Sequence, residues 1–372
     1  MFSRIVGQDD IIQRLKQSVQ ENKVASSYLF YGPAGVGKLT TAFELAKAVN
    51  CYNLQKGDSC DECSSCRKIN HFTHPDVIYI FPIPNFELDE EKGGFKKQVD
   101  EEQVSAYINR RKQKPYLPFY FNKSTEIRID YIRMLQKRII YRPQEGNYRV
   151  LIFENADQMN QSSANAFLKT LEEPPEYVIL ILTTTKVNSL LPTIISRCQK
   201  VHFNSVSIQD VEKLLVEQYH HRDDEAKIYA RICNGNVENA IRMAEEEQVK
   251  IREQSLEILN YVYNNDLRAF YEFNEKFSKN SQTKRLADIF DHLILWLGDL
   301  IHLEYNPKQI INIDKLNELQ IFRNKMDFNE GKIQKVIDFL ELAKRRLEGH
   351  INKELLLINA FYKIYNLYYS QE

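Results

Sequence analysis

Net charge and long apolar runs are both missing from this sequence. Its 50 lysine and arginine residues nearly balance 51 aspartate and glutamate residues, so the formal charge of −1 gives no overall attraction to nucleic acid. The most apolar late segment, from Leu355, has about eight uncharged residues, far short of the roughly 20 that span a bilayer. The N-terminal segment MFSRIVGQDD carries charges and lacks the apolar run of a signal peptide. We therefore expect a soluble, cytoplasmic protein without membrane contact.

Internal repeats and low-complexity tracts are also absent, and 372 residues suffice for two or three domains. In the first half, helical patterns alternate with continuous Val/Ile/Leu runs. Continuous rather than alternating runs are typical of parallel strands that are covered on both faces. The sequence therefore predicts a parallel α/β sheet, with strands in the segments 26–31, 76–81, 148–156 and 177–185.

The pattern changes from about Ile208, where helical periodicity begins to dominate and continues to the end of the chain. The segment from about 82 to 125 fits neither half and is interpreted as an insertion, with one helix in EEQVSAYINRRK. This insertion has a basic cluster that we interpret as a solvated face, with local DNA contact as the alternative. The cluster consists of Arg110, Arg111, Lys112 and Lys114.

The stretch GPAGVGK follows a predicted strand and precedes a predicted helix, as a phosphate-binding loop of the form G-x-x-x-x-G-K requires. Backbone amides of the loop would face the phosphates, and Lys38 would reach the outer ones. The next position, which should provide a hydroxyl for magnesium, is Leu39. Thr40 cannot simply replace it, because one residue further along a helix rotates the side chain by about 100°. The candidate phosphate-binding residues are therefore Gly32, Gly35, Gly37, Lys38 and Thr40, with metal positioning impaired.

A second departure follows the apolar run VLIF. P-loop ATPases place an Asp after such a strand to orient magnesium, often followed by a Glu that polarises water. Here these positions hold Glu154, which is one methylene longer, and Asn155, which cannot accept a proton. Asp157 lies farther along, where related ATPases carry Asp or His. These substitutions indicate a site that can bind ATP or ADP but does not hydrolyse it.

Six cysteines are present, and four of them cluster in the segment 51–66 at C-x8-C-x2-C-x2-C spacing. Such a cluster favours a metal site in a reducing compartment over disulfides or free thiols. Four thiolates leave no open coordination position, so we predict a structural zinc ion rather than a catalytic one. The predicted ligands are Cys51, Cys60, Cys63 and Cys66, and the following His71 and His74 are interpreted as ordinary loop residues.

Together these motifs resemble the clamp-loader branch of the AAA+ family. They are, in chain order, FSRIVGQ, the phosphate loop, the four-cysteine module after the first helix, NAFLKTLEEPP, the strand that ends in Thr183–Thr185, and Ser196-Arg197-Cys198. NAFLKTLEEPP and Ser-Arg-Cys are specific to bacterial DNA polymerase III clamp-loader subunits and their relatives. The resemblance covers about residues 1–250 except the insertion, and the last third matches only by being helical.

This resemblance implies the organisation of the whole chain. We expect an AAA+ RecA-like parallel-sheet domain over 1–204, which contains the zinc module at 51–66 and the insertion at about 82–125. A small helical lid over 205–248 and an all-α collar domain over 249–372 would follow.

Two subunit types fit this template, the ATP-hydrolysing gamma/tau subunit and the delta-prime subunit. In the family, gamma/tau keeps the complete loop, an Asp-Glu pair and a lid arginine in a Gly-x-x-Arg-x-Ala context, where this chain has Glu238. The departures at Leu39, Glu154, Asn155 and Glu238 therefore favour the delta-prime type, which need not hydrolyse ATP. The retained Lys38 leaves nucleotide binding open.

The resemblance also implies that Arg197 projects into the ATP site of an adjacent subunit as an arginine finger; the alternative is a helix-capping arginine in an ordinary salt bridge. The implied partners are the gamma/tau and delta subunits, the sliding clamp, and primed DNA bound through the complex. Two alternative functions remain, a divergent gamma/tau-like ATPase and a zinc-stabilised nucleotide-binding switch outside replication.

Overall fold

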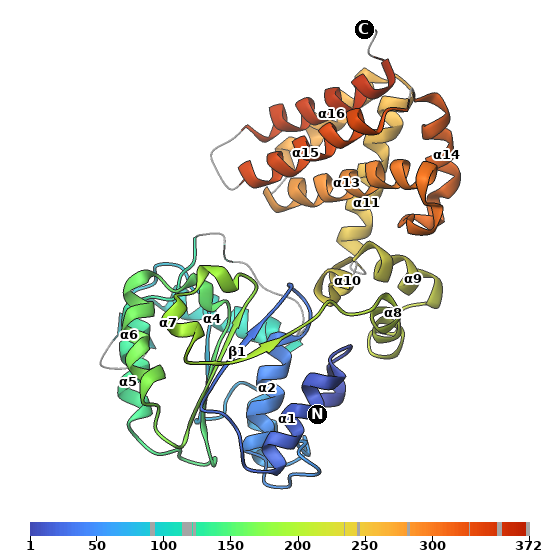
Figure 1. Ribbon diagram of the computed structural model, residues 1–372. Coiled ribbons are helices and arrows are strands. Elements are labelled where there is room, and N and C mark those ends of the chain that lie inside the picture. The colour runs from blue at the N-terminus through green and yellow to red at the C-terminus, as the bar shows by residue number, and fades with distance from the viewer. Residues whose placement is uncertain are drawn as a thin grey trace. The chain divides into compact units, whose positions relative to one another are not determined.

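Five parallel strands form the centre of the N-terminal half of the chain (Figure 1). The computed structural model describes residues 1–89, 94–113, 121, 124–233, 235–243, 246–280, 283–326, 328–347 and 352–369. The strands lie in the spatial order β2-β5-β6-β1-β7. Their bounds are β1 (Ser27–Tyr31), β2 (Val77–Ile80), β5 (Arg149–Phe153), β6 (Val178–Thr184) and β7 (Gln199–His202).

The four predicted strands are thus confirmed as β1, β2, β5 and β6, and the predicted parallel sheet is confirmed with them. Strand β7 is not predicted because its sequence QKVH is polar and mostly exposed at the sheet edge. It pairs with β1, where Phe30 lies opposite Val201, while β6 pairs with the other side of β1. The connections after the adjacent strands β1 and β6 therefore run in opposite directions, to β2 and to β7, and open α/β sheets bind ligands at the carboxyl ends of strands beside such a point.

Helices cover both faces of this sheet, with α1 and α2 on one face and α5, α6 and α7 on the other (Figure 1). The continuous apolar runs of the strands follow from this, because side chains on both faces are buried. On one face, Leu151 and Leu180 lie in the same core as Phe167, whose ring is 4.7 Å from that of Phe153. The bounds of these helices are α1 (Asp9–Gln20), α2 (Lys38–Val49), α5 (Ile129–Ile139), α6 (Gln161–Glu172) and α7 (Pro192–Ile195).

Two segments interrupt the alternation of strands and helices. The cysteine segment between α2 and β2 contains the short helix α3 (Ser64–Asn70). The insertion contains the two-stranded pair β3 (Leu88–Asp89) and β4 (Gly94–Phe95), followed by helix α4 (Gln98–Gln113). The helix predicted in this insertion is confirmed.

The prediction that the basic cluster forms a solvated face is wrong for Arg111, whose side chain is only 6% exposed. Its guanidinium is paired with a buried carboxylate, so this residue cannot contribute to a DNA-binding surface. Arg110 and Lys112 are exposed, and Lys114 lies outside the described residues.

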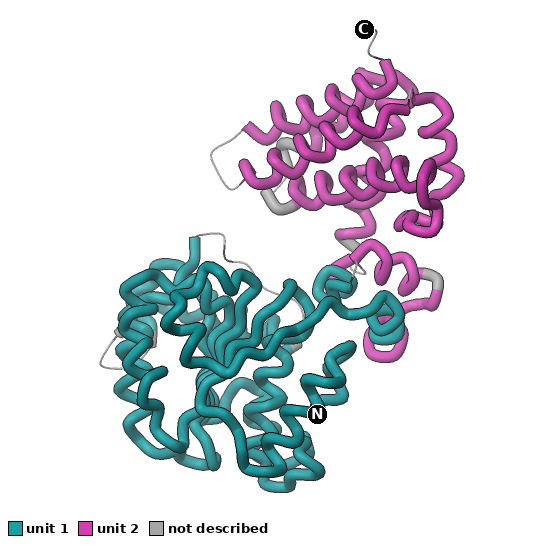
Figure 2. The backbone as a smooth tube through the Cα atoms, in the orientation of Figure 1, with its two compact units in different colours: residues 1–214, 234–241 teal, residues 215–233, 242–372 magenta. Residues whose placement is uncertain are grey.

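The chain divides into two compact units, which Figure 2 shows in different colours. Unit 1 comprises residues 1–214 and 234–241, and unit 2 comprises residues 215–233 and 242–372. Three helices follow the sheet at the boundaries of these units, α8 (Ile208–Glu217), α9 (Asp223–Ile232) and α10 (Val237–Met243). The expected division into domains over 1–204, 205–248 and 249–372 stays a prediction.

Most of unit 2 is a helical domain whose core is rich in aromatic side chains. The rings of Phe270 and Phe361 stack at 3.7 Å, and Trp296 is 1% exposed, with its Nε1 donating to Ser255 Oγ at 2.9 Å. None of the described helices has both the length and the apolar composition to cross a membrane. The helices of this domain are α11 (Glu246–Tyr263), α12 (Leu267–Asn280), α13 (Thr283–Tyr305), α14 (Leu316–Lys325), α15 (Glu330–Arg346) and α16 (Lys353–Tyr369).

Candidate functional site

The phosphate loop lies between the end of β1 and the start of α2, and its conformation depends on glycine. Gly32 and Gly35 have φ values of 144° and 68°, a region that side chains rarely adopt. A Cβ at Gly32 would lie 2.2 Å from the carbonyl oxygen of Phe203, and one at Gly35 would lie 1.9 Å from Asn236 Oδ1. The loop is therefore closely packed, and Val237 N–H fixes it further by donating to the Gly35 carbonyl at 3.1 Å.

Lys38 is buried, and its ammonium group donates to the backbone carbonyls of the loop. The Gly32 oxygen accepts at 2.9 Å, and the Pro33 oxygen also accepts. Burial lowers the pKa of Lys38 to about 8, although the negative charges of Glu238, Asp157 and Glu154 act to raise it. Lys38 is thus a desolvated cation that interacts electrostatically with three carboxylates of the same unit.

A polar cleft of about 340 Å³ lies over the loop at the carboxyl edge of the sheet. Both Leu39 and Thr40 line this cleft, so the rotation between them does not remove Thr40 from it. Gly32 belongs to the same loop but does not line the cleft. The lining residues include the predicted Gly35, Gly37, Lys38, Thr40, Glu154 and Asn155, together with Tyr107, Arg111, Asp157, Thr183 and Glu238.

The Glu154 carboxylate directly follows β5, and three side chains of the same chain already bind it. Tyr107 Oη donates to its Oε2 at 2.6 Å, Tyr79 Oη donates to the same oxygen, and Arg111 Nη2 donates to Oε1. The sequence pattern does not predict these partners. Their only signal is that Tyr107 and Arg111 are four residues apart, which places them on one face of α4.

Asn155, at the position where the sequence pattern of P-loop ATPases places a catalytic base, has only an amide side chain. Its backbone is in the left-handed region with φ of 50°, and its N–H donates to Thr183 Oγ1 at 3.4 Å. Asp157, farther along, accepts a hydrogen bond from Thr184 Oγ1 at 2.6 Å. No group at position 155 can therefore take a proton from an attacking water molecule.

These residues fit a phosphate group but do not fit magnesium. The loop amides and Lys38 suit the binding of an anion. Magnesium requires oxygen ligands in a near-octahedral arrangement, whereas Leu39 has no oxygen in its side chain. Both oxygens of Glu154 and one oxygen of Asp157 already accept hydrogen bonds from the protein. Within the loop, the Thr40 hydroxyl is therefore a single remaining side-chain ligand beside Lys38. We therefore derive no magnesium-dependent step at this cleft.

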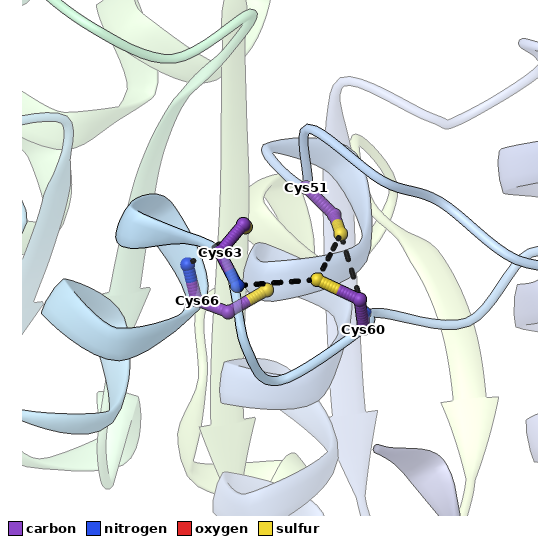
Figure 3. A group of neighbouring side chains, drawn as sticks. All are labelled: Cys51, Cys60, Cys63 and Cys66. Atoms are coloured by element: carbon purple, nitrogen blue, oxygen red, sulfur yellow. Dashed lines mark hydrogen bonds between the residues drawn. The ribbon is translucent and has the colours of Figure 1, made fainter.

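The four clustered cysteines converge on one point (Figure 3). Their Sγ atoms all lie within 4.8 Å of one another, and those of Cys51 and Cys60 are 3.5 Å apart. A tetrahedral zinc site with bonds of about 2.3 Å places its sulfur atoms about 3.8 Å apart. The backbone N–H groups of Cys60, Cys63 and Cys66 donate to sulfur at 3.3, 3.3 and 3.4 Å, as expected around thiolates. The group therefore fits a zinc ion.

Neither histidine that follows the cysteines belongs to this group. His74 is buried, with its Nε2 3.2 Å from Ser65 Oγ and its Nδ1 accepting from the Asp76 N–H at 3.1 Å. The cysteine segment is anchored instead through Asp61, which accepts from Lys47 of α2 at 2.6 Å. This ion pair fixes the cysteine segment to α2.

Arg197 lies just after α7 and does not line the cleft of its own chain. Its Nη1 donates to the Thr193 carbonyl at 3.0 Å, and its Nη2 pairs with Glu172 Oε1 at 2.8 Å. The Arg197 side chain is 34% exposed and that of Glu172 is 50% exposed. Within the isolated chain this is the helix-capping, ion-paired arrangement, at a position accessible from outside.

Comparison with known proteins adds sequence relationships over both units. Family models described as DNA polymerase III, delta subunit and its C-terminal part match residues 7–207 and 246–365. The delta' subunit of DNA polymerase III from Bacillus subtilis is 25% identical over 358 residues, which are 94% of each chain. The tau subunit from the same organism is 29% identical over 255 residues, 66% of this chain but only 37% of the tau chain.

A solved structure supports the fold. The DNA polymerase III gamma subunit-related protein from Thermotoga maritima superposes with a TM-score of 0.51 at 17% identity, over 96% of this chain and 99% of the other. With the family match over more than half of the sequence, the chain belongs to the DNA polymerase III delta subunit family and is an AAA+ clamp-loader subunit of the delta-prime/gamma/tau type.

Proposed function

We propose that this chain is a non-hydrolysing, delta-prime-type subunit of the clamp loader that serves DNA polymerase III in DNA replication. The observation that carries the proposal is the composition of the cleft, where Leu39 replaces the hydroxyl that binds magnesium and Asn155 replaces the base. A cleft with a phosphate loop but without these two groups can hold ATP or ADP and lacks the means to cleave it.

The extent of the sequence relationships supports the delta-prime type. The match to the Bacillus subtilis delta' subunit extends over 94% of this chain and so includes both units, whereas the match to tau covers 66% of it. A relationship to delta' over both units, together with an altered cleft, is expected for a subunit that assists a neighbouring ATPase.

Arg197 is the residue that we propose assists that neighbour. Both side chains of its ion pair with Glu172 are substantially exposed, and such pairs contribute only about 0.2–1 kcal/mol. The guanidinium can therefore leave Glu172 at low cost and neutralise charge on the phosphoryl group of an ATP held by an adjacent subunit. Arginine fingers of this kind accelerate phosphoryl transfer by about 10³ to 10⁵.

The other components follow from this assignment. The partners are the gamma/tau and delta subunits, and the complex places the sliding clamp on primed DNA in the cytoplasm. Cys51, Cys60, Cys63 and Cys66 hold a structural zinc ion. Any bound nucleotide is a static ligand of Gly32, Gly35, Gly37, Lys38 and Thr40, beside Glu154 and Asn155.

The test is ATP turnover by the full-length chain alone and then mixed with an ATPase subunit of the loader. We expect no turnover above background for the chain alone, and stimulated turnover in the mixture. Arg197→Ala should remove most of that stimulation, whereas Arg142→Ala, at an exposed arginine of the same unit, should not. Normal stimulation by the Arg197 variant would contradict the finger.

A divergent gamma/tau-like ATPase is the second candidate, favoured by the retained Lys38 and by the 29% identity to tau. It predicts magnesium-dependent ATP hydrolysis by the isolated chain, abolished by Lys38→Ala. Detection of that activity would replace the first proposal.

A further inference from the structure

The acidic group at the metal position of the cleft is enclosed by its own chain. The side chains of Glu154 and Arg111 are 10% and 6% exposed, and the guanidinium donates to Oε1. The second carboxylate oxygen accepts from Tyr107 at 2.6 Å and from Tyr79. Both oxygens of this acid are therefore directed at protein donors.

Two of the three donors come from α4 in the insertion, which contains none of the motifs on which the resemblance to clamp loaders rests. The Tyr107 ring stacks on Phe81 at 4.1 Å with an angle of 11°, and on Phe121 at 5.5 Å. The Arg111 guanidinium lies 5.9 Å from the centre of the Tyr107 ring. This face of α4 is thus packed in place beside the cleft, while the neighbouring Arg110 is exposed.

A guanidinium in this position competes directly with a divalent cation. Both groups require the same carboxylate oxygens, and their charges repel each other at close range. The guanidinium also provides N–H donors in a fixed fork that suits a carboxylate. Leu39 offers no oxygen that would favour the metal in this competition.

We propose that Arg111 takes the place of the divalent metal ion in this cleft, and that its pairing with Glu154 closes the cleft to magnesium. The insertion helix then acts as a strap that carries a permanent cation to the acid. This goes beyond the proposed function, because it assigns the exclusion of metal to a residue of the insertion and requires no partner subunit.

The test measures manganese binding to the zinc-saturated, full-length chain by electron paramagnetic resonance. Manganese prefers carboxylate oxygens, as magnesium does, and the thiolate site is already filled with zinc. We expect no tight site in the wild-type chain. Arg111→Ala should bind one manganese ion at least tenfold more tightly than wild type, and Arg111→Ala/Glu154→Gln should lose that site. The matched control is Arg110→Ala, which removes the same charge from the exposed side of α4 and should behave as wild type.

Two outcomes would overturn the proposal. One is a manganese site in the wild-type chain that Glu154→Gln removes, and the other is an unchanged affinity in Arg111→Ala.

Because loss of a buried ion pair can impair folding, hydrogen exchange of Glu154→Gln provides an independent measurement. Protection should fall over residues 98–113 and stay unchanged over the cysteine segment 51–66; unchanged protection of α4 would show that the pair does not hold the strap. These readouts involve neither ATP turnover nor Arg197, so their failure is distinguishable from failure of the proposed function.

Discussion

Asp76 directly precedes β2, and its side chain binds the segment that leads into β5. Its carboxylate is fully buried and accepts from the successive N–H groups of Gln144, Glu145 and Gly146 at 2.8, 2.8 and 2.9 Å. Arg149, the first residue of β5, adds an ion pair at 3.1 Å. Burial alone would raise the pKa of Asp76, but these hydrogen bonds outweigh it and hold the pKa below its usual range.

Replacing this carboxylate should destabilise the sheet unit in a pH-dependent way. Asp76→Asn leaves Arg149 buried without its only carboxylate partner among the described residues, and we expect a loss of about 3 kcal/mol in the free energy of unfolding at pH 7. Because the pKa of Asp76 is lower in the folded state, its carboxylate contributes fully to stability above the unfolded-state pKa of about 3.9. This contribution is lost as the pH falls through the folded-state pKa. Urea unfolding followed by circular dichroism should therefore show a difference in the free energy of unfolding between wild type and Asp76→Asn that narrows below about pH 4.

The control for this prediction is Asp130→Asn, where the side chain is 42% exposed and pairs with Arg128 at the surface. That change should alter stability by less than about 1 kcal/mol. A gap for Asp76→Asn that stayed constant down to pH 2 would contradict the proposed role of its charge.

Among single residues, those that act together with close neighbours in the sequence were predictable. The four cysteines converge because they follow one another within a short segment, and the loop glycines are fixed by local backbone geometry. Arg111 could not be predicted in the same way, because its partner Glu154 is 43 positions away and a run of basic residues is usually solvated.

Helix α6 ends with Glu172, the partner of Arg197, and its N-terminus is capped by Asn160. Asn160 Oδ1 accepts from the Ser163 N–H at 2.9 Å and from its hydroxyl at 2.7 Å. Asn160→Ala should cost about 1 kcal/mol, whereas Asn160→Asp should retain most of the stability because Asp also caps helices. Thermal unfolding of the three chains measures this difference, and equal losses for both variants would exclude a capping role.

The cysteine segment is predicted to depend on zinc for its structure. Chelation under reducing conditions should increase hydrogen exchange over residues 51–70, because metal binding contributes directly to the folding of such sites. Cys60→Ser should lower the zinc content of the purified chain, whereas Cys198→Ser, at a buried cysteine outside the group, should not. Unchanged protection after zinc removal would contradict this prediction.

The elements of the fold were predictable to different degrees. Strands β1, β2, β5 and β6 have continuous apolar sequences because both of their faces are covered. Strand β7 has no such signal because it lies at the edge of the sheet, and the pair β3–β4 has strands of only two residues each.

Over the whole molecule, the function depends on whether Arg197 acts outside its own chain. Glu172→Gln removes the charge that holds Arg197, so an arginine finger should remain active or act more readily in the assembled loader. A capping role instead predicts that Glu172→Gln and Arg197→Ala weaken the assembly alike. ATP turnover of the reconstituted complex distinguishes the two, with a loss of at least about tenfold expected for Arg197→Ala only.

The two units contributed unequally to this assignment. All the motifs with specific chemistry lie in unit 1, whereas most of unit 2 was predictable only as helices from its hydrophobic periodicity. Helical cores tolerate many apolar sequences of similar volume, so such a domain has few residues that identify it.

The core of unit 2 has a practical consequence. Trp296 is the only tryptophan in the sequence, and it is buried against Ser255 with the Arg252 guanidinium 5.2 Å from its ring. Ultraviolet emission excited selectively at the indole thus arises from the helical domain alone. The protein has a natural optical label for that domain, and its melting can be followed without attaching a dye.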